Sequence, residues 1–407
     1  MRTCPGPQSP LAQGRARTQT DKMQHLSQSP TDPAFVQDPY PFYDRARAAG
    51  DLFFWADYGK PCALSHRAVM AILKDRRMGR EPVDPPAIPH RLAPFYDIEA
   101  HSMLELEPPR HTRLRGLVVR AFTSRRIAAL EPEIAGLCAE LIERFPSGPF
   151  DLMEAYARII PVVVICRLLG VPEERAPDLL SWSNAMVAMY QARRSPGIEE
   201  AAIAASRAFR AFVEETIKAR RARPGPDLLT DLIAAEEAGE KLSTDELVTT
   251  VILLLNAGHE ATVHSIGNAL NLLLKEGGPI VDPPTVEEAL RLDPPLHMFD
   301  RWVYEDLTLF GNAFRRGDRV GCLLAAANRD PQAFPDPAAF RPGRTTPQIT
   351  SFGAGIHFCV GAPLARLELH IALRTLQVRC PRLALAEPPR YADVYHFRGL
   401  ERLNVAV

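Results

Sequence analysis

The stretch SFGAGIHFCVGAPLARLE, residues 351–368, decides how this chain is interpreted. Gly353, Gly355 and Gly361 surround Cys359 and let the backbone fold tightly around the sulfur and approach a flat ligand closely. The following PLARLELHIALRTLQ is predicted to be a helix that starts just after the cysteine. The free N–H groups at its N-terminus would stabilise an anionic sulfur. This arrangement favours a thiolate that binds a metal as an axial ligand.

Two other roles for this cysteine compete with metal binding. A buried structural cysteine is the common case. A cysteine hydrolase is the other, with His357 as the base two residues before Cys359. Residues at i and i+2 of a loop rarely form a nucleophile–base pair, and no orienting Asn or Asp is evident. Neither role explains why so much glycine surrounds the sulfur.

The composition narrows the class of protein. The chain has 407 residues, of which 46% are hydrophobic, so it can bury a large core. The 48 Lys and Arg nearly balance the 49 Asp and Glu, which gives no reason to expect nucleic acid or an anionic membrane as a partner. The chain contains no run of eighteen apolar residues, so we expect no membrane anchor. The seven cysteines lie far apart, without a CxxC pair. We therefore expect a cytoplasmic protein without a disulfide framework or structural zinc.

The order of the segments predicts a mainly α protein. We expect residues 1–33 to be a disordered lead and residues 34–407 to form a single domain. Residues 81–94 are rich in proline and predict a long surface loop. Helical patterns then continue almost to residue 275, and short strand candidates lie among the turns of the C-terminal third.

One predicted helix is long enough to cross the molecule. Ser243 and Glu246 form a capping-box pattern, and the apolar periodicity ends at Gly277 and Gly278. Its middle reads NAGHEATVH, residues 256–264. Glycine inside a helix costs about 1 kcal/mol relative to alanine, so Gly258 needs a reason. Either a flat group lies against this nearly bare stretch of helix, or another helix packs closely there.

HEATVH also resembles the HExxH signature of zinc proteases. Here the two histidines, His259 and His264, are five residues apart rather than four. Five steps of about 100° place them roughly 140° apart around the helix, so they cannot easily share a metal. No third ligand is evident, and a zinc hydrolase is therefore disfavoured.

FGAGIHFCVG resembles the haem-binding loop of the cytochrome P-450 family, and every fixed position of the family pattern fits. EEALRLDPP resembles the family's ExxR segment, in which Glu288 and Arg291 form an ion pair that Arg344 of FRPGR completes. The resemblance covers residues of about 35 to 407. It implies the cytochrome P-450 fold, with a large helical domain, a smaller β-rich part, and haem between the long central helix and the helix after the cysteine.

The resemblance also implies the residues that hold haem b. Cys359 would be the axial ligand of the iron. Cationic or hydrogen-bonding partners of the propionates would be His111, Arg115, Arg301 and His357. The remaining positions implied to contact the haem are Phe352, Gly353, Gly361, Ala257 and Gly258. The stretch around Ala257 and Gly258 resembles the family's oxygen-binding motif.

The implied activity is monooxygenation of a small hydrophobic substrate by O2. Electrons would come from a separate ferredoxin and its reductase, with Arg113, Arg366 and Arg374 as candidates for docking an acidic partner. The family usually has an acid followed directly by threonine. Here Glu260 is followed by Ala261 and only then by Thr262, so local distortion, a water or a substrate hydroxyl would have to replace the missing alcohol.

Other expectations remain open at this stage. The substrate pocket is expected to be lined by Leu253, Asn256, His297, Phe299 and Phe397. The segment between the long helix and ExxR, residues 275–287, is shorter than usual in the family. Alternatives to monooxygenation are oxidative coupling, dehydration or isomerisation, peroxide-driven turnover, and a non-catalytic haem sensor. The substrate class is not determined.

Overall fold

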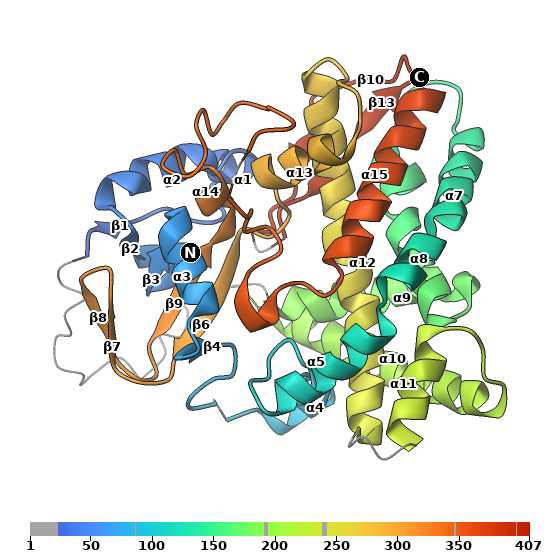
Figure 1. The fold of residues 1–407 in the computed structure, drawn as a ribbon, viewed down its shortest axis with the longest axis horizontal. Coiled ribbons are helices and arrows are strands. Elements are labelled where there is room, and N and C mark those ends of the chain that lie inside the picture. The colour runs from blue at the N-terminus through green and yellow to red at the C-terminus, as the bar shows by residue number, and fades with distance from the viewer. Residues whose placement is uncertain (1–22, 86, 191–193, 238–241, 346, 396) are drawn as a thin grey trace, which may run out of the picture.

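The computed structural model describes residues 23–407, apart from 86, 191–193, 238–241, 346 and 396. Helices make up one side of the molecule, and a twisted sheet with a few short helices makes up the other (Figure 1). The boundary predicted at residue 34 is too late, because residues 23–33 already belong to the fold. Met23 is buried, and His25–Leu26 pairs in parallel with Phe54 and Trp55. Residues 1–22 of the predicted lead lie outside the described residues.

The helices follow the apolar periodicity of the sequence. They are α1 (Pro33–Gln37), α2 (Tyr40–Ala46), α3 (His66–Lys74), α4 (Ala93–Glu99), α5 (Arg110–Ala121), α6 (Ser124–Ala129), α7 (Glu131–Glu143), α8 (Ile159–Leu169), α9 (Ala176–Val187), α10 (Pro196–Ala222), α11 (Leu228–Glu237), α12 (Thr244–Lys275), α13 (Pro283–Leu292), α14 (Leu324–Asn328) and α15 (Ala362–Arg379). A short π-helical segment, Met153–Ala157, precedes α8.

The strands are short and gather in the β-rich part and near the C-terminus. They are β1 (His25–Leu26), β2 (Leu52–Trp55), β3 (Lys60–Ala63), β4 (Met78–Gly79), β5 (Phe150–Asp151), β6 (Met298–Val303), β7 (Leu307–Leu309), β8 (Asn312–Phe314), β9 (Arg319–Leu323), β10 (Ala384–Leu385), β11 (Arg390–Tyr391), β12 (Leu400–Arg402) and β13 (Asn404–Ala406). The main sheet has the order β1-β2-β3-β9-β6-β4. Its strands come from residues 25–79 and 298–323, so the sheet ties the N-terminal segment to a segment in the last third of the chain.

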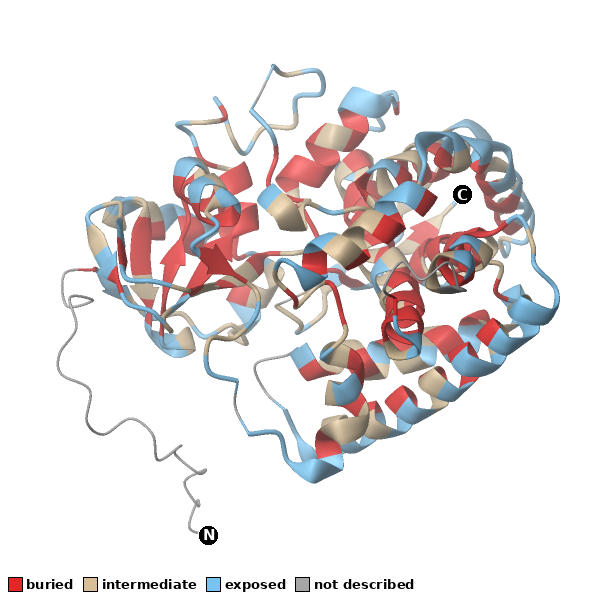
Figure 2. Cartoon of the chain, turned by 60° about the horizontal axis from the view of Figure 1, so that its bottom comes forward, coloured by how far each residue is buried: buried red, intermediate tan, exposed pale blue. Residues whose placement is uncertain are grey.

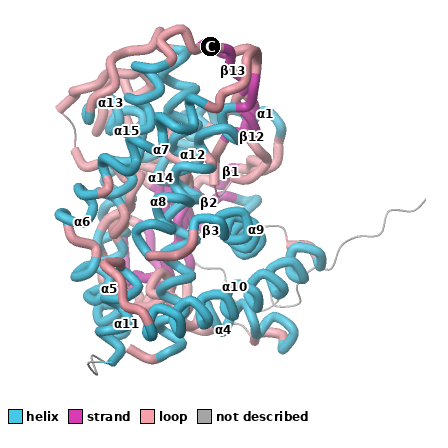
Figure 3. The backbone as a smooth tube through the Cα atoms, turned by 90° about the vertical axis from the view of Figure 1, so that its right-hand side faces the viewer, coloured by secondary structure: helices cyan, strands magenta, loops and turns pink. Residues whose placement is uncertain are grey.

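Helix α12 is the axis of the helical side (Figures 1 and 3). The predicted capping box is confirmed: the Ser243 side chain accepts from the Glu246 N–H, and the Glu246 carboxylate accepts from the Ser243 N–H. The helix has 32 residues and is therefore about 48 Å long. It is buried on most of its circumference because α8, α10 and α15 pack around it. Figure 2 shows that buried residues gather in the interior of the molecule and exposed ones on its outside. It remains helical through residues 256–264.

A buried ionic cluster fixes the segment that precedes the cysteine loop. Arg291 of α13 donates from Nε and Nη2 to the two carboxylate oxygens of Glu288, each at 2.8 Å. The Arg344 Nε donates to the same carboxylate at 3.0 Å. Arg291 also donates to three backbone carbonyls, those of Asn328, Pro337 and Ala339. The structure thus brings together the three residues expected from the ExxR pattern, and they clamp residues 328–344 onto α13.

The described cysteines are free thiols, and all except Cys359 are buried. Among the residues that the structure describes, no three or more His, Cys, Asp or Glu side chains form a cluster suited to a metal ion. Within the same residues, none of the helices combines the length and the apolar character needed to cross a bilayer.

Candidate functional site

A large cavity lies where α12, α15 and the cysteine loop meet. It encloses about 2010 Å³ of space that no atom fills, the open mouth included. Most of its lining is apolar. The predicted site residues that line it are Cys359, His111, Arg115, Arg301, His357, Phe352, Gly353, Gly361, Leu253, Asn256, Ala257, Gly258, Glu260, Ala261, Thr262, Phe299 and Phe397.

The cysteine loop holds the Cys359 sulfur open to this cavity. The Cys359 N–H donates to the Phe352 carbonyl at 2.9 Å, which closes the loop. Gly353 and Gly355 have left-handed φ angles of 69° and 72°, and a Cβ on Gly355 would lie 2.4 Å from the Leu73 carbonyl oxygen. These two positions therefore require glycine.

Burial raises the pKa of the Cys359 thiol, and two kinds of neighbour act against this effect. The backbone N–H groups of Gly361 and Ala362, at the start of α15, bond the sulfur, and the guanidinium of Arg115 adds positive charge nearby. The predicted helix start after the cysteine is confirmed, since α15 begins at Ala362. Metal binding would favour the thiolate outright, because the metal supplies the missing positive charge.

Two arginines and two histidines gather on one side of the cavity. His111 and Arg301 are buried, and the His111 and His357 rings lie with their centroids 4.4 Å apart and their planes tilted by 45°. The His357 Nε2 donates to Glu107 at 2.9 Å. The Arg115 Nη2 donates to the Phe358 carbonyl at 2.5 Å and so supports the cysteine loop from below.

This side of the cavity, called the cationic side because of Arg115 and Arg301, is suited to bind an anion. Burial, followed by the charges of His357 and Arg115, lowers the pKa of His111 to about 4. The buried Nδ1 of His111 has no hydrogen-bond partner among the described residues. Buried polar atoms are normally satisfied, so a donor or acceptor is missing here. A carboxylate placed between these side chains would satisfy His111 and balance the arginines.

Ala257 and Gly258, the two small residues in the middle of α12, have different surroundings. Ala257 is exposed to the cavity. A Cβ on Gly258 would lie 2.7 Å from Cγ1 of Ile165 in α8, so this glycine permits close helix packing. Gly258 and Ile165 both still border the cavity. Close packing of α8 therefore accounts for Gly258. Ala257 is the residue that leaves the cavity side of α12 bare enough for a flat group to lie against it.

The part of the cavity wall formed by residues 253–265 of α12, here called the distal side, carries the expected acid, Glu260, and the hydroxyl groups of Thr262 and Ser265. The Glu260 carboxylate lies 3.4 Å from the His264 Nε2 and 3.7 Å from the His259 Nε2. Ala261 leaves the usual threonine position without a hydroxyl. The Ser265 hydroxyl donates to the Ala261 carbonyl at 2.8 Å, and both Ser265 and Thr262 border the cavity.

One expected pocket residue lies elsewhere. His297 is fully buried and does not border the cavity. Its Nδ1 is 2.9 Å from the Tyr43 hydroxyl, within a cluster of aromatic rings that includes Tyr40 and Tyr395. The tertiary neighbours explain the difference, because the Tyr43 hydroxyl and the surrounding aromatic rings hold the imidazole away from the cavity. The neighbours Leu296 and Phe299 border the cavity instead.

Several cavity residues were missed by the sequence reasoning. Arg80 pairs with Glu105, and the Tyr190 hydroxyl donates to Glu99 at 2.8 Å, at a polar part of the lining. Burial raises the pKa of Glu99 to about 7. Arg80, Glu99 and Glu105 flank the proline-rich loop. The length of this loop was the only feature of the sequence that could have indicated these residues as part of the site. Glu368, at the end of the quoted motif, also borders the cavity.

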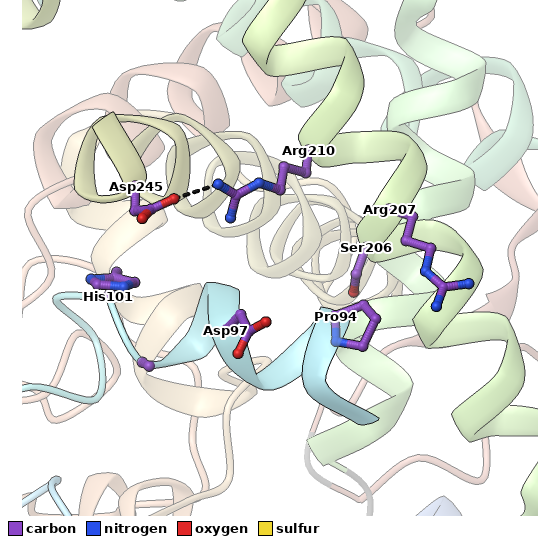
Figure 4. A pocket seen from close by; sticks show the side chains of 8 residues that line it. Pro94, Asp97, His101, Ser206, Arg207, Arg210 and Asp245 are labelled. Carbon is purple, nitrogen blue, oxygen red and sulfur yellow. Dashed lines mark hydrogen bonds and ion pairs between the residues drawn. The ribbon is translucent and has the colours of Figure 1, made fainter. Parts of the chain in front are cut away.

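A second pocket opens between α4 and α10, which run side by side (Figures 3 and 4). It is lined by Pro94, Asp97, Ala100, His101, Ser206, Arg207, Arg210 and Asp245. Arg210 is paired with both Asp245 and Glu214. The lining lacks the cysteine, the cationic side and the apolar surface of the main cavity, so we do not assign the reaction to it.

The arginines expected to dock an electron donor are engaged within the chain. Arg113 forms a two-bond pair with Glu246, with N–O distances of 3.0 and 2.5 Å. Arg366 pairs with Glu287, and Arg374 donates to the Gln377 side chain at 3.0 Å. Carboxylates thus offset the charge of Arg113 and Arg366, which weakens their expected role.

Comparisons with known proteins agree with this geometry. The family model described as cytochrome P-450 matches residues 50–277 and 283–379. The cytochrome P-450 monooxygenase PikC of Streptomyces venezuelae is 36% identical over 91% of this chain and 91% of its own length. The polyketide biosynthesis cytochrome P-450 PksS of Bacillus subtilis is 35% identical over 95% of this chain and 100% of its own. The crystal structure of BioI, a P-450 in complex with an acyl carrier protein ligated to hexadec-9Z-enoic acid, superposes with a TM-score of 0.86 at 32% identity, covering 92% of this chain and 99% of that one.

Proposed function

Because this chain belongs to the cytochrome P-450 family and is a haem b monooxygenase, we propose that it inserts oxygen into a C–H or C=C bond of a small hydrophobic molecule. One atom of O2 enters the substrate. Two electrons, from NAD(P)H through a ferredoxin, and two protons reduce the other atom to water. The observation that carries the proposal is the open Cys359 thiol facing a cavity with a cationic side.

The residues present fit haem b. Cys359 would ligate the iron, and the orphaned His111 Nδ1, with Arg115, Arg301 and His357, would hold the propionates. Phe352, Gly353, Gly361 and Ala257 would lie against the ring. The bound haem supplies the redox chemistry that activates O2, and the thiolate donates electron density to it.

The chain's own contribution is positioning, exclusion of water and proton supply. Leu253, Phe299 and Phe397 give the distal side an apolar surface. The Asn256 Oδ1 is buried at the same wall without a hydrogen-bond partner among the described residues, while its amide nitrogen is 3.8 Å from the Met186 sulfur. An apolar pocket with one unsatisfied amide suits an apolar substrate that carries one hydroxyl or N–H group.

The relatives suggest a chemical class for this substrate. PksS is named for polyketide biosynthesis, and another relative, 38% identical, is named 6-deoxyerythronolide B hydroxylase. We propose a hydrophobic polyketide-like or acyl substrate of comparable size. The electron donor is proposed to be a separate ferredoxin with its reductase. Its docking surface would involve residues other than Arg113 and Arg366, whose charges are paired.

The test is the spectrum of the dithionite-reduced protein with carbon monoxide. We expect a red-shifted Soret band for the wild type and its loss in Cys359→Ser. Cys380→Ser, at the opposite end of α15 and outside the cavity, is the matched control and should keep the band. Absence of haem, or a band unchanged in Cys359→Ser, would overturn the assignment.

Turnover then separates monooxygenation from the alternatives. With NADPH, a surrogate ferredoxin and its reductase, we expect oxygenated products from compounds that shift the spin state of the haem. Products without added oxygen would instead favour coupling, dehydration or isomerisation. Turnover with peroxide alone, and none with the ferredoxin, would contradict the proposed electron supply.

A further inference from the structure

The acid of the distal side is held between two histidines of its own helix. Oε1 of Glu260 faces the His264 Nε2 at 3.4 Å, and Oε2 faces the His259 Nε2 at 3.7 Å. His264 follows Glu260 by one helical turn, so the two side chains share a face of α12. Glu260 borders the cavity, whereas His264 does not, although its side chain is 18% exposed. The carboxylate therefore lies between the cavity and a partly exposed imidazole.

The two histidines are not equivalent. The His259 Nδ1 donates to the Leu255 carbonyl at 2.7 Å, so this nitrogen carries a proton. His259 is fully buried, and burial lowers its pKa, which keeps the ring neutral. Its Nε2 has no hydrogen-bond partner among the described residues. His259 is thus a fixed, neutral neighbour, and His264 is the member of the pair with access to protons.

The loop that contains Gly399 packs closely against the His264 ring. A Cβ on Gly399, in the loop before β12, would lie 1.7 Å from the His264 Nδ1. The loop therefore covers the ring closely and holds it beside α12 only because residue 399 has no side chain. The Nδ1 is buried without a partner among the described residues, so the Nε2 that faces Glu260 is the nitrogen placed for exchange with an acid.

The charged groups around the carboxylate favour its ionised form. Burial raises the pKa of Glu260, but His264, which has the largest opposing effect, and the more distant Arg158 bring it below its usual range. Arg158, at the end of the segment Met153–Ala157, is itself paired with Glu154. Gly399, in the loop before β12, lies against the His264 ring and adds no charge. An ionised acid beside the cavity must be reprotonated each time it gives up a proton.

We propose that His264 reprotonates Glu260, and that this pair supplies protons to the cavity in place of the alcohol missing at Ala261. The proton moves from the His264 Nε2 to the Glu260 Oε1 and then from the carboxyl to a water in the cavity, and His264 regains a proton from outside. The 3.4 Å distance closes to a hydrogen bond with a small rotation, as is common for catalytic pairs before substrate binds. The proposal rests on the proposed monooxygenase function.

The first test follows the carboxyl group itself. In protein carrying 13C-labelled glutamate, reduced and bound to carbon monoxide, the Glu260 carboxyl signal is assigned with Glu260→Gln and titrated. We expect His264→Gln, which keeps a polar side chain without a titratable proton, to raise the apparent pKa of Glu260 by about one unit or more. His370→Gln is the matched control, because His370 also lies near a carboxylate, Asp282, but outside the cavity. An unchanged titration in His264→Gln would overturn the proposal.

The second test measures proton delivery during turnover without a known substrate. With a surrogate ferredoxin, two electrons from NADPH and two protons reduce each O2 to peroxide at the haem site, while NADPH oxidation releases one proton to the solution. We expect His264→Gln to slow this reaction by at least about tenfold and to increase its solvent isotope effect, with His370→Gln unchanged. If Thr262→Val or Ser265→Ala does so and His264→Gln does not, an alcohol is the donor and the proposal fails. A normal carbon monoxide spectrum in each variant separates this failure from failure of the haem assignment.

Discussion

At the scale of single residues, Glu368 is the most unusual group in the site. It lies on α15, is 1% exposed, and its Oε2 has no hydrogen-bond partner among the described residues. Burial raises its pKa well above the usual value. The carboxyl is therefore protonated in the folded protein, as expected when ionisation would leave a buried charge without compensation.

The first prediction concerns the pH dependence that Glu368 imparts. Below the ordinary carboxyl pKa, both the folded and the unfolded chain carry the proton. Above it, the unfolded chain loses the proton while the folded chain keeps it, so stability falls as pH rises toward the folded pKa. We expect the free energy of unfolding of Glu368→Gln to decrease less with pH than that of the wild type, by up to about 1.4 kcal/mol per pH unit.

Urea unfolding of the two proteins at several pH values between 5 and 8 measures this difference. Other titrating groups are common to both proteins and cancel in the comparison. Parallel curves for the wild type and Glu368→Gln would show that Glu368 is ionised or hydrogen-bonded in the folded protein, and the prediction would be wrong.

At the scale of elements, the contact between α12 and α8 explains a glycine that the sequence left open. The missing Cβ of Gly258 is the space that Ile165 fills. Alanine normally stabilises a helix by about 1 kcal/mol relative to glycine. Overpacking typically costs 1–3 kcal/mol, so we expect Gly258→Ala to bring no gain and to cost about 1 kcal/mol net.

A double-mutant cycle checks the second prediction. In an Ile165→Ala background the space is free, and Gly258→Ala should then stabilise the protein by about 1 kcal/mol. Chemical denaturation of the four proteins supplies the free energies. A stabilising effect of Gly258→Ala alone, accompanied by loss of haem, would mean that the residue serves the ring rather than the helix contact.

At the scale of the whole molecule, the Glu288 cluster joins parts that are distant in sequence. Arg291 links α13 to carbonyls of residues 328, 337 and 339, immediately before the cysteine loop. Buried ion pairs are strongly destabilised when one partner is removed, because the remaining charge has no compensation.

The third prediction compares the two arginines of this cluster. Arg291→Met should lower the free energy of unfolding by about 3–5 kcal/mol, and we expect the protein to lose haem at a lower urea concentration. Arg344→Met should cost clearly less, because Arg291 and the Arg341 N–H still bond the Glu288 carboxylate. Urea titration followed by far-UV circular dichroism and haem absorbance provides both values. Equal losses for the two variants would contradict the assigned hierarchy.

Local physical chemistry allowed much of this molecule to be predicted. The capping box at Ser243, the helix after Cys359 and the need for glycine beside the thiol follow from neighbours along the chain, because caps and tight turns involve residues a few positions apart. The resemblance carried by the cysteine motif gave the family and the cofactor. These features do not depend on which distant segments come together.

Only the tertiary structure decided the roles that depend on distant neighbours. His297 turns into an aromatic cluster because Tyr43 and Tyr395 lie there, and Arg113 is neutralised by Glu246 across 133 positions of sequence. Gly258 is small because of Ile165, and Gly399 makes room for His264. The sequence by itself thus determined that the chain presents a thiolate to a haem, since that chemistry is local. Side-chain burial, charge pairing and the path of protons were decided by packing, since each depends on atoms that only the fold brings within a few ångströms.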